Sequence, residues 1–110
     1  MRLRADIWAS AVVRTAMSAG AYATVVRKGH AEGGVILVKL NTLDGRATVL
    51  TPMTGMDGRR RWMRGTGSEP VMDVDAEAYL TRAINRDPDC WIIEIEDRQG
   101  RHFFDEEIGD

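Results

Sequence analysis

The spacing of apolar residues indicates two helices. Between residues 5 and 19 the apolar positions recur with a helical period, which predicts an amphipathic helix that ends at Gly20. A second set of apolar residues with helical spacing predicts a helix over residues 74–86. This helix is expected to end at Asp87 and Pro88, because the residue before a proline disfavours helical backbone. The side chains expected on the buried faces are Ile7, Trp8, Ala11, Val12, Thr15, Ala16 and Ala19 in the first helix, and Ala76, Tyr79, Leu80, Ala83 and Ile84 in the second.

Segments rich in β-branched residues predict the strands. The expected strands cover residues 21–28, 35–41, 46–51, 59–64 and 91–96, with a return strand over residues 101–104. The glycine-bearing segment 29–34 is expected to join the first two strands as a hairpin, and Asp44 with Gly45 forms a second turn. Pro52 is expected to end the third strand, because proline cannot donate a hydrogen bond to a neighbouring strand.

This order of elements predicts an α+β fold. We expect an antiparallel sheet of about five strands with two helices packed on one face, in the order helix, three or four strands, helix, two strands. A chain of 110 residues is long enough for one hydrophobic core. Residues 1–110 are therefore expected to form a single globular domain, with a flexible loop over residues 53–72 and a short acidic tail over residues 105–110.

Composition narrows the class of protein. The chain is 44% hydrophobic and 29% charged with a net charge of -2, which indicates neither global disorder nor a general affinity for nucleic acid. The single cysteine, Cys90, excludes an internal disulfide and a cysteine zinc cage, and it is expected to be a small buried apolar residue rather than a reactive thiol. A chain with one thiol fits a reducing compartment, so a cytoplasmic location is expected.

The N-terminal residues have some features of a signal peptide. They begin basic and reach an A-x-A sequence, but Asp6 and Arg14 bracket an uncharged run of only about seven residues, at the bottom of the range for the apolar region of a signal peptide. The amphipathic helix is therefore the preferred interpretation. No stretch of the sequence approaches the ~20 apolar residues of a membrane span.

The carboxylates near the C-terminal end allow two interpretations. Trp91, Ile93 and Ile95 are expected on one strand face, with Glu94 and Glu96 on the other. Oxygen ligands of this kind suit magnesium or calcium, and the preceding Pro-Asp pair resembles a nuclease pattern whose lysine is replaced by Glu96. A metal-dependent hydrolase or nuclease is therefore the alternative hypothesis, whereas an exposed acidic strand face is preferred. The ligands of that alternative site would be Glu94, Glu96, Asp97 and His102.

No complete catalytic set is visible in the sequence. The chain has no G-x-S-x-G elbow, no phosphate-loop lysine pattern and no G-x-G-x-x-G. Its two histidines, His30 and His102, lie far apart in the sequence and do not indicate a zinc site. We therefore expect no cofactor and no catalytic residue, and an enzyme is not the favoured class.

The arginine-rich segment is the best candidate for a binding surface. Four arginines surround Trp62, so they are placed to contact phosphates while the ring stacks on a base. The competing interpretation puts Trp62 in the core, with the arginines solvated or paired with the acidic hairpin. The predicted function is a non-enzymatic binding or protein-interaction module for a protein or an anionic ligand, with nucleic acid less favoured and a homodimer as a further arrangement. Its predicted binding residues are Arg59, Arg61, Trp62 and Arg64.

Two segments carry a family resemblance. The sequences ADIWASAVVR near the start and DPDCWIIEIEDRQGRHF near the end resemble the domain of unknown function 1491 family, which consists of small alphaproteobacterial proteins. The resemblance implies a bacterial, soluble, single-domain protein. It implies no established activity, cofactor or catalytic residue. The matching positions are Asp6, Ile7, Trp8, Arg14, Asp87, Pro88, Asp89, Trp91, Glu94, Ile95, Glu96, Asp97, Arg98, Gly100 and Phe103.

Overall fold

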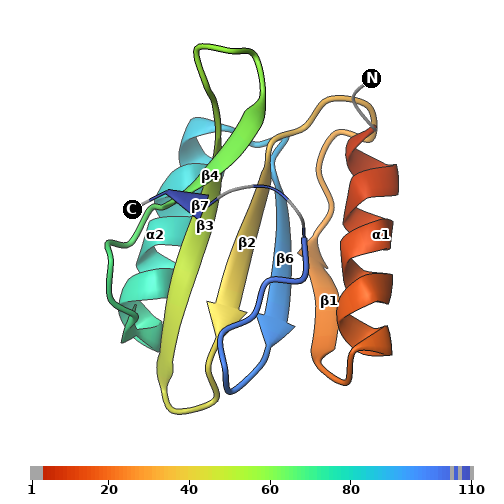
Figure 1. Cartoon of the computed structure of the whole chain (residues 1–110). Coiled ribbons are helices and arrows are strands. Elements are labelled where there is room, and N and C mark those ends of the chain that lie inside the picture. The colour runs from red at the N-terminus through yellow and green to blue at the C-terminus, as the bar shows by residue number, and fades with distance from the viewer. Residues whose placement is uncertain (1–3, 105, 107, 110) are drawn as a thin grey trace.

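The computed structural model describes residues 4–104, 106, 108 and 109. These residues form two helices and one sheet of seven strands (Figure 1). Across the sheet the strands follow the order β1-β6-β2-β3-β4-β7, and β5 pairs with β3. The elements are α1 (Ala5–Ser18), β1 (Tyr22–Arg27), β2 (Ile36–Asn41), β3 (Arg46–Thr54), β4 (Arg60–Arg64), β5 (Val71–Met72), α2 (Asp73–Arg86), β6 (Trp91–Glu96) and β7 (Ile108–Gly109).

The predicted α+β class is confirmed. The prediction of an antiparallel sheet of about five strands is wrong, because the sheet has seven strands and contains both parallel and antiparallel pairs. β6 lies between β1 and β2, antiparallel to the first and parallel to the second. β1 and β2 therefore do not form the expected hairpin. The segment 29–34 instead passes the start of β6, where His30 N donates to Asp89 O (2.9 Å) and Trp91 Nε1 donates to His30 O (2.8 Å).

The two helices cover opposite faces of the sheet, which corrects the prediction that they share one face. Val38 and Ile93 pack in one core with residues of α1, whereas their neighbours Leu37 and Ile92 pack in a second core with residues of α2. Successive side chains of a strand point to opposite faces, so these cores lie on either side of the sheet. β2 and β6 are central strands that are apolar on both faces, and both faces therefore need a cover. Figure 1 shows α2 behind β3 and α1 beside β1.

Both helices lie close to their predicted ranges, but the buried stripe of α1 is shifted. Its buried residues are Ala5, Trp8, Ala9, Val12 and Ala16, whereas Ile7 is 49% exposed. In α2 the predicted Ala76, Leu80 and Ala83 are buried. Among the described residues, neither helix is long and apolar enough to cross a membrane.

The C-terminal segment differs from the predicted return strand. Residues 101–104 are not part of a strand, and Phe104 instead packs on Trp8 and Trp62 over the α1 side of the sheet. The chain then reaches β7, which pairs in parallel with β4 and forms the edge of the sheet opposite β1 (Figure 1). Asp105, Glu107 and Asp110 of the predicted acidic tail lie outside the described residues.

The segment 53–72 is predicted to be a flexible loop that includes a strand over residues 59–64. It contains the end of β3, all of β4, which matches that predicted strand, and β5. Pro52 does not end β3, which continues to Thr54 with Pro52 opposite Trp62 of β4. The register of β2 with β3 begins at Val38 and Leu50, so Pro52 lies beyond that pairing. Its missing N–H therefore removes no hydrogen bond from the β2–β3 ladder.

Two glycines allow the loop before β2 to pass the start of β6. A Cβ atom on Gly34 would lie 2.5 Å from Asp89 O and 2.9 Å from Trp91 Cδ1, and one on Gly29 would also collide with Asp89 O. A Cβ atom on Gly33 would meet nothing within 4 Å. Close packing at this crossing therefore requires glycine at positions 29 and 34 but not at position 33.

The first prediction follows from this contrast. We expect Gly34→Ala to lower the free energy of unfolding by about 1–3 kcal/mol, because the added methyl group must displace backbone. Gly33→Ala is the matched control and should change that free energy by no more than about 0.5 kcal/mol. Urea denaturation of both variants measures the difference, and equal stabilities would show that the loop does not pack against β6 in this way.

Candidate functional site

The predicted binding residue Trp62 lies in the core. Its side chain is fully buried, and its ring packs against Trp8 at 5.3 Å and Phe104 at 4.8 Å between centroids. Its Nε1 donates a hydrogen bond to Glu106 Oε1 at 3.0 Å. A ring in this position has no exposed face on which a base could stack.

The other predicted binding residues lie on different surfaces. Arg64 is on the α1 side of β4, as are Arg60 and Trp62, whereas Arg61 points to the α2 side. Arg59 lies in the β3–β4 turn, with its side chain 84% exposed. Asp57 in the same turn accepts from Arg61 Nη2 at 3.2 Å and lies 4.0 Å from Arg59 Nε. The structure thus divides the four predicted residues between the core, the hairpin and the two sides of the sheet.

The acidic residues of the alternative metal site do not converge. Glu94 is on the α2 side of β6 beside Lys39, whereas His102 packs on Phe104 on the α1 side. Asp97 is buried in the turn after β6, where it is paired with Arg101. Among the described residues, no group of three His, Cys, Asp or Glu side chains is placed to hold a metal ion. The geometry therefore does not support a metal-dependent hydrolase at these residues.

Sequence reasoning missed Lys39, which accounts for the position of Glu94. Its Nζ lies 2.6 Å from Asp73 Oδ1, 2.8 Å from Glu77 Oε2 and 3.9 Å from Glu94 Oε1, although the residue is only 4% exposed. Burial opposes the charged form, but the hydrogen bonds and the nearby negative charges outweigh it and raise the pKa of Lys39. The only signal in the sequence is a lysine inside the apolar run of β2.

Glu94 consequently has a structural role. It lies close to the Lys39 ammonium and accepts a hydrogen bond from Asn41 Nδ2 at 2.9 Å. Its side chain is 20% exposed, so the expected exposed acidic face is partly covered at this position.

Asp97 and Arg101 hold the turn that follows β6. Asp97 Oδ1 lies 2.8 Å from Arg101 Nη2, and Asp97 Oδ2 accepts from Arg101 N at 2.8 Å. The side-chain hydrogen bond from Arg101 lowers the pKa of Asp97 to about 2, against an opposing effect of burial. The next residue, His102, lies on the α1 side of the sheet.

The second prediction concerns acid stability. Because the folded-state pKa of Asp97 is below its ordinary value of 3.8, its contribution to stability is present above that value and is lost as the pH falls toward 2. We expect Asp97→Asn to lower the free energy of unfolding at neutral pH and to flatten its decline between pH 4 and pH 2. Glu69→Gln, at an exposed position, is the control and should keep the wild-type decline. Urea denaturation at a series of pH values checks this, and an unchanged decline in Asp97→Asn would contradict it.

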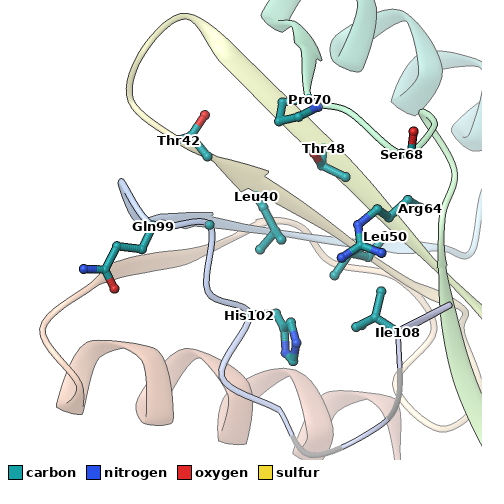
Figure 2. Close-up of a pocket in the computed structure, with 11 residues that line it drawn as sticks. Leu40, Thr42, Thr48, Leu50, Arg64, Ser68, Pro70, Gln99, His102 and Ile108 are labelled. Carbon is teal, nitrogen blue, oxygen red and sulfur yellow. The ribbon is translucent and has the colours of Figure 1, made fainter. Parts of the chain in front are cut away.

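Arg64 and His102 meet at a pocket on the α1 side of the sheet. The pocket has a volume of about 210 Å³ and lies between the loop over residues 65–70 and the turn after β6. Its apolar lining comes from Leu40, Leu50 and Ile108, whereas Arg64 and His102 approach it from β4 and from the C-terminal segment (Figure 2). The other polar residues that line it are Thr42, Thr48, Ser68 and Gln99.

His102 presents a hydrogen-bond donor when it is neutral. Its Nδ1 accepts from Phe104 N at 3.3 Å, so the proton of the neutral ring resides on Nε2. Burial lowers the pKa of His102, and the positive charge of Arg64 lowers it further. The two groups are therefore close enough for their charges to interact.

None of the described residues that line this pocket is a carboxylate. The polar groups there are a guanidinium, an imidazole, hydroxyls and an amide, all of which can donate hydrogen bonds. The arrangement is suited to an anion. Sequence reasoning named Arg64 and His102 in two different hypotheses, because nothing in the sequence shows that the C-terminal segment returns to β4.

The third prediction tests the electrostatic contact. Arg64→Gln should raise the pKa of His102, because the substitution removes a nearby positive charge. Arg59→Gln removes an arginine whose side chain is 84% exposed in the β3–β4 turn and should leave the pKa of His102 unchanged. NMR titration of the His102 ring protons measures both. An equal pKa in wild type and Arg64→Gln would show that the two side chains do not share the pocket.

Comparison with known proteins identifies relatives over the whole described fold. The model of the family "Protein of unknown function (DUF1491)" matches residues 3–105. A crystal structure of a DUF1491 family protein from Caulobacter crescentus CB15 is 43% identical with a TM-score of 0.89, and covers 98% of this chain and 100% of its own. An NMR structure of a DUF1491 family protein from the same organism is 43% identical with a TM-score of 0.86. The match covers 100% of this chain and 99% of that one.

A more distant relative is protein Atu0922 from A. tumefaciens. Its solution structure is 31% identical with a TM-score of 0.75, and the match covers 87% of this chain and 86% of that one. The chain matches no protein among those with curated descriptions.

Proposed function

The chain belongs to the DUF1491 family of proteins of unknown function, and we propose that it is a non-enzymatic binding module that holds an anionic group in the pocket between Arg64 and His102. The observation that carries this proposal is the convergence of Arg64 and His102 on a pocket whose described lining residues include no carboxylate. Arg64 Nη1 also donates to Gly109 O at 3.4 Å, and a guanidinium has five N–H donors in all. A guanidinium suits carboxylate and phosphate groups because its N–H donors form a planar fork.

The apolar lining supports this proposal. Leu40, Leu50 and Ile108 exclude part of the water from the pocket, and charge interactions are stronger where the surroundings are less polar. Ser68 and Thr48 add hydroxyl groups, whereas the Thr42 hydroxyl lies 2.6 Å from Asp44 Oδ1 and 3.1 Å from Arg46 O, within its own turn. A volume of about 210 Å³ is large enough for a phosphate, sulfate or carboxylate group.

The hydrogen bond at His102 favours binding over catalysis. In a general base, the nitrogen that does not face the substrate usually donates to an orienting carboxylate. Here Nδ1 accepts from the backbone N–H of Phe104 instead. Within residues 4–104, 106, 108 and 109, no carboxylate accepts from Nδ1 to stabilise the ring after it takes a proton from a nucleophile.

The fourth prediction is sulfate binding at this pocket. Titration with sodium sulfate at constant ionic strength should shift the His102 resonances with saturation and a Kd of about 1 mM, which is typical of a small ligand held by few contacts. Arg64→Gln should weaken binding about tenfold or more through loss of a charged hydrogen bond. The matched control Arg59→Gln should bind as wild type. Absence of saturation in wild type, or equal binding by Arg64→Gln, would contradict the proposal.

The pH dependence gives an independent measurement of the same site. Sulfate stays a dianion between pH 5 and pH 8, so any change in affinity reports on the protein. Binding should strengthen as the pH falls through the lowered pKa of His102, because the protonated ring adds a positive charge beside Arg64. His102→Asn should bind sulfate with an affinity that does not vary over this range.

A further inference from the structure

A second pocket lies where β2 and β3 separate. The two strands pair with each other only from Val38 opposite Leu50 to the β2–β3 turn. Before this point residues 36 and 37 of β2 pair with β6, and beyond it residues 51–54 of β3 pair with β4. The space between the separated ends has a volume of about 220 Å³. We call it the fork pocket, and its lining residues include Gly34, Val35, Ile36, Pro52, Thr54 and Arg60.

Pro52 favours this separation. If the β2–β3 register continued, Ile36 would lie opposite Pro52. Proline has no N–H group, so that pair could not form both of its hydrogen bonds. On the other edge of β2, Trp91 N of β6 donates to Val35 O at 2.7 Å. Because backbone groups along a strand alternate in direction, the N–H and C=O of Ile36 point toward β3 and face the fork pocket.

Arg60 brings a positive charge to this pocket. Its guanidinium lies over the Trp8 ring at 5.6 Å, and the residue is half-buried. Among the residues that the structure describes, no carboxylate forms an ion pair with Arg60, whereas Asp57 pairs with the neighbouring Arg61. The described residues that line the fork pocket likewise include no carboxylate. The Trp8 ring thus positions a guanidinium whose charge no described carboxylate neutralises.

We propose that the fork pocket binds the carboxylate of an organic acid with an apolar body. The N–H donors of Arg60 match the two carboxylate oxygens, and one arginine charge matches a monoanion. Ile36 and Pro52 line the pocket together with Arg60, so they contact the apolar body. A free carboxylic acid and the C-terminal residue of a peptide share this chemistry. The fork pocket has no lining residue in common with the pocket of Arg64 and His102, so each can be tested without the other.

The experiment follows the amide NMR signals of the full chain at constant ionic strength. The probe is sodium hexanoate, and the comparison ligands are acetate and the uncharged hexanamide. Hexanoate should shift the amide signals of Gly34, Ile36 and Thr54 with saturation. Acetate should bind about fourfold or more weakly, because one buried methylene group alone strengthens binding by about that factor. Hexanamide should bind about tenfold or more weakly, because it cannot pair with the arginine charge.

A further ligand distinguishes the two sources of the carboxylate. N-acetyl-leucine carries the carboxylate of a peptide C-terminus together with an amide group that can bond to the backbone of Ile36. Tighter binding of N-acetyl-leucine than of hexanoate would support the end of a peptide as the occupant, whereas equal or weaker binding would support a free acid.

Substitution of Arg60 tests its role in holding the carboxylate. Arg60→Gln should weaken hexanoate binding about tenfold or more, whereas Arg59→Gln, at the adjacent and exposed position, should bind as wild type. Arg60→Lys keeps the charge but loses the planar donors, so its affinity should be intermediate. Amide spectra of each variant establish that it is folded. The sulfate response of His102 should be retained in Arg60→Gln, which separates a failure of this proposal from a failure of the other pocket.

Three results would overturn the proposal. Equal binding of hexanoate and hexanamide by the wild-type protein would indicate apolar contact without recognition of charge. Equal binding of hexanoate by wild type and Arg60→Gln would show that Arg60 does not hold the carboxylate. Absence of saturable shifts at Gly34 and Ile36, with or without shifts around His102, would show that the fork pocket does not take the ligand.

Discussion

The position of β6 between β1 and β2 is the constraint on which the rest of the structure depends. Each edge of β6 pairs with a strand from the first half of the chain, so the backbone of the sheet is complete only when β6 is in place. Its side chains also serve both cores, with Ile93 on the α1 side and Ile92 on the α2 side. A strand that is buried on both faces requires a cover on each, and the two helices therefore take opposite sides.

The central position of β6 also determines where charged groups can lie. Lys39 on the neighbouring β2 is covered by α2, so Asp73, Glu77 and Glu94 surround its ammonium. These carboxylates stabilise a buried cation and are not a free metal-binding cluster. To reach β7 from β6, the C-terminal segment must cross the α1 side of β2 and β3. The pocket between Arg64 and His102 forms along this crossing, so its geometry is a product of the strand order.

Local patterns in the sequence predicted the helices, most strands and the alternation within β6, because each depends on residues close together in the chain. Strand order could not be predicted in this way. The glycines of the segment 29–34 suit a hairpin equally well, and only the contact of Gly34 with Asp89 O shows that β6 passes there. The same limit applies to the site. Arg64 was recognised as a candidate from its arginine-rich neighbours, but its approach to His102 depends on a crossing that no local pattern encodes.

A central strand that is made late has a consequence for synthesis of the protein in the cell. While the ribosome has yet to release residues 91–96, β1 and β2 have no partner between them, and apolar residues such as Val38 and Leu37 have no complete core to enter. Exposed apolar surface and unpaired strand edges make incomplete chains of this kind prone to aggregate. A chain cut before Trp91 would lack the strand that joins β1 to β2, and both cores would be incomplete.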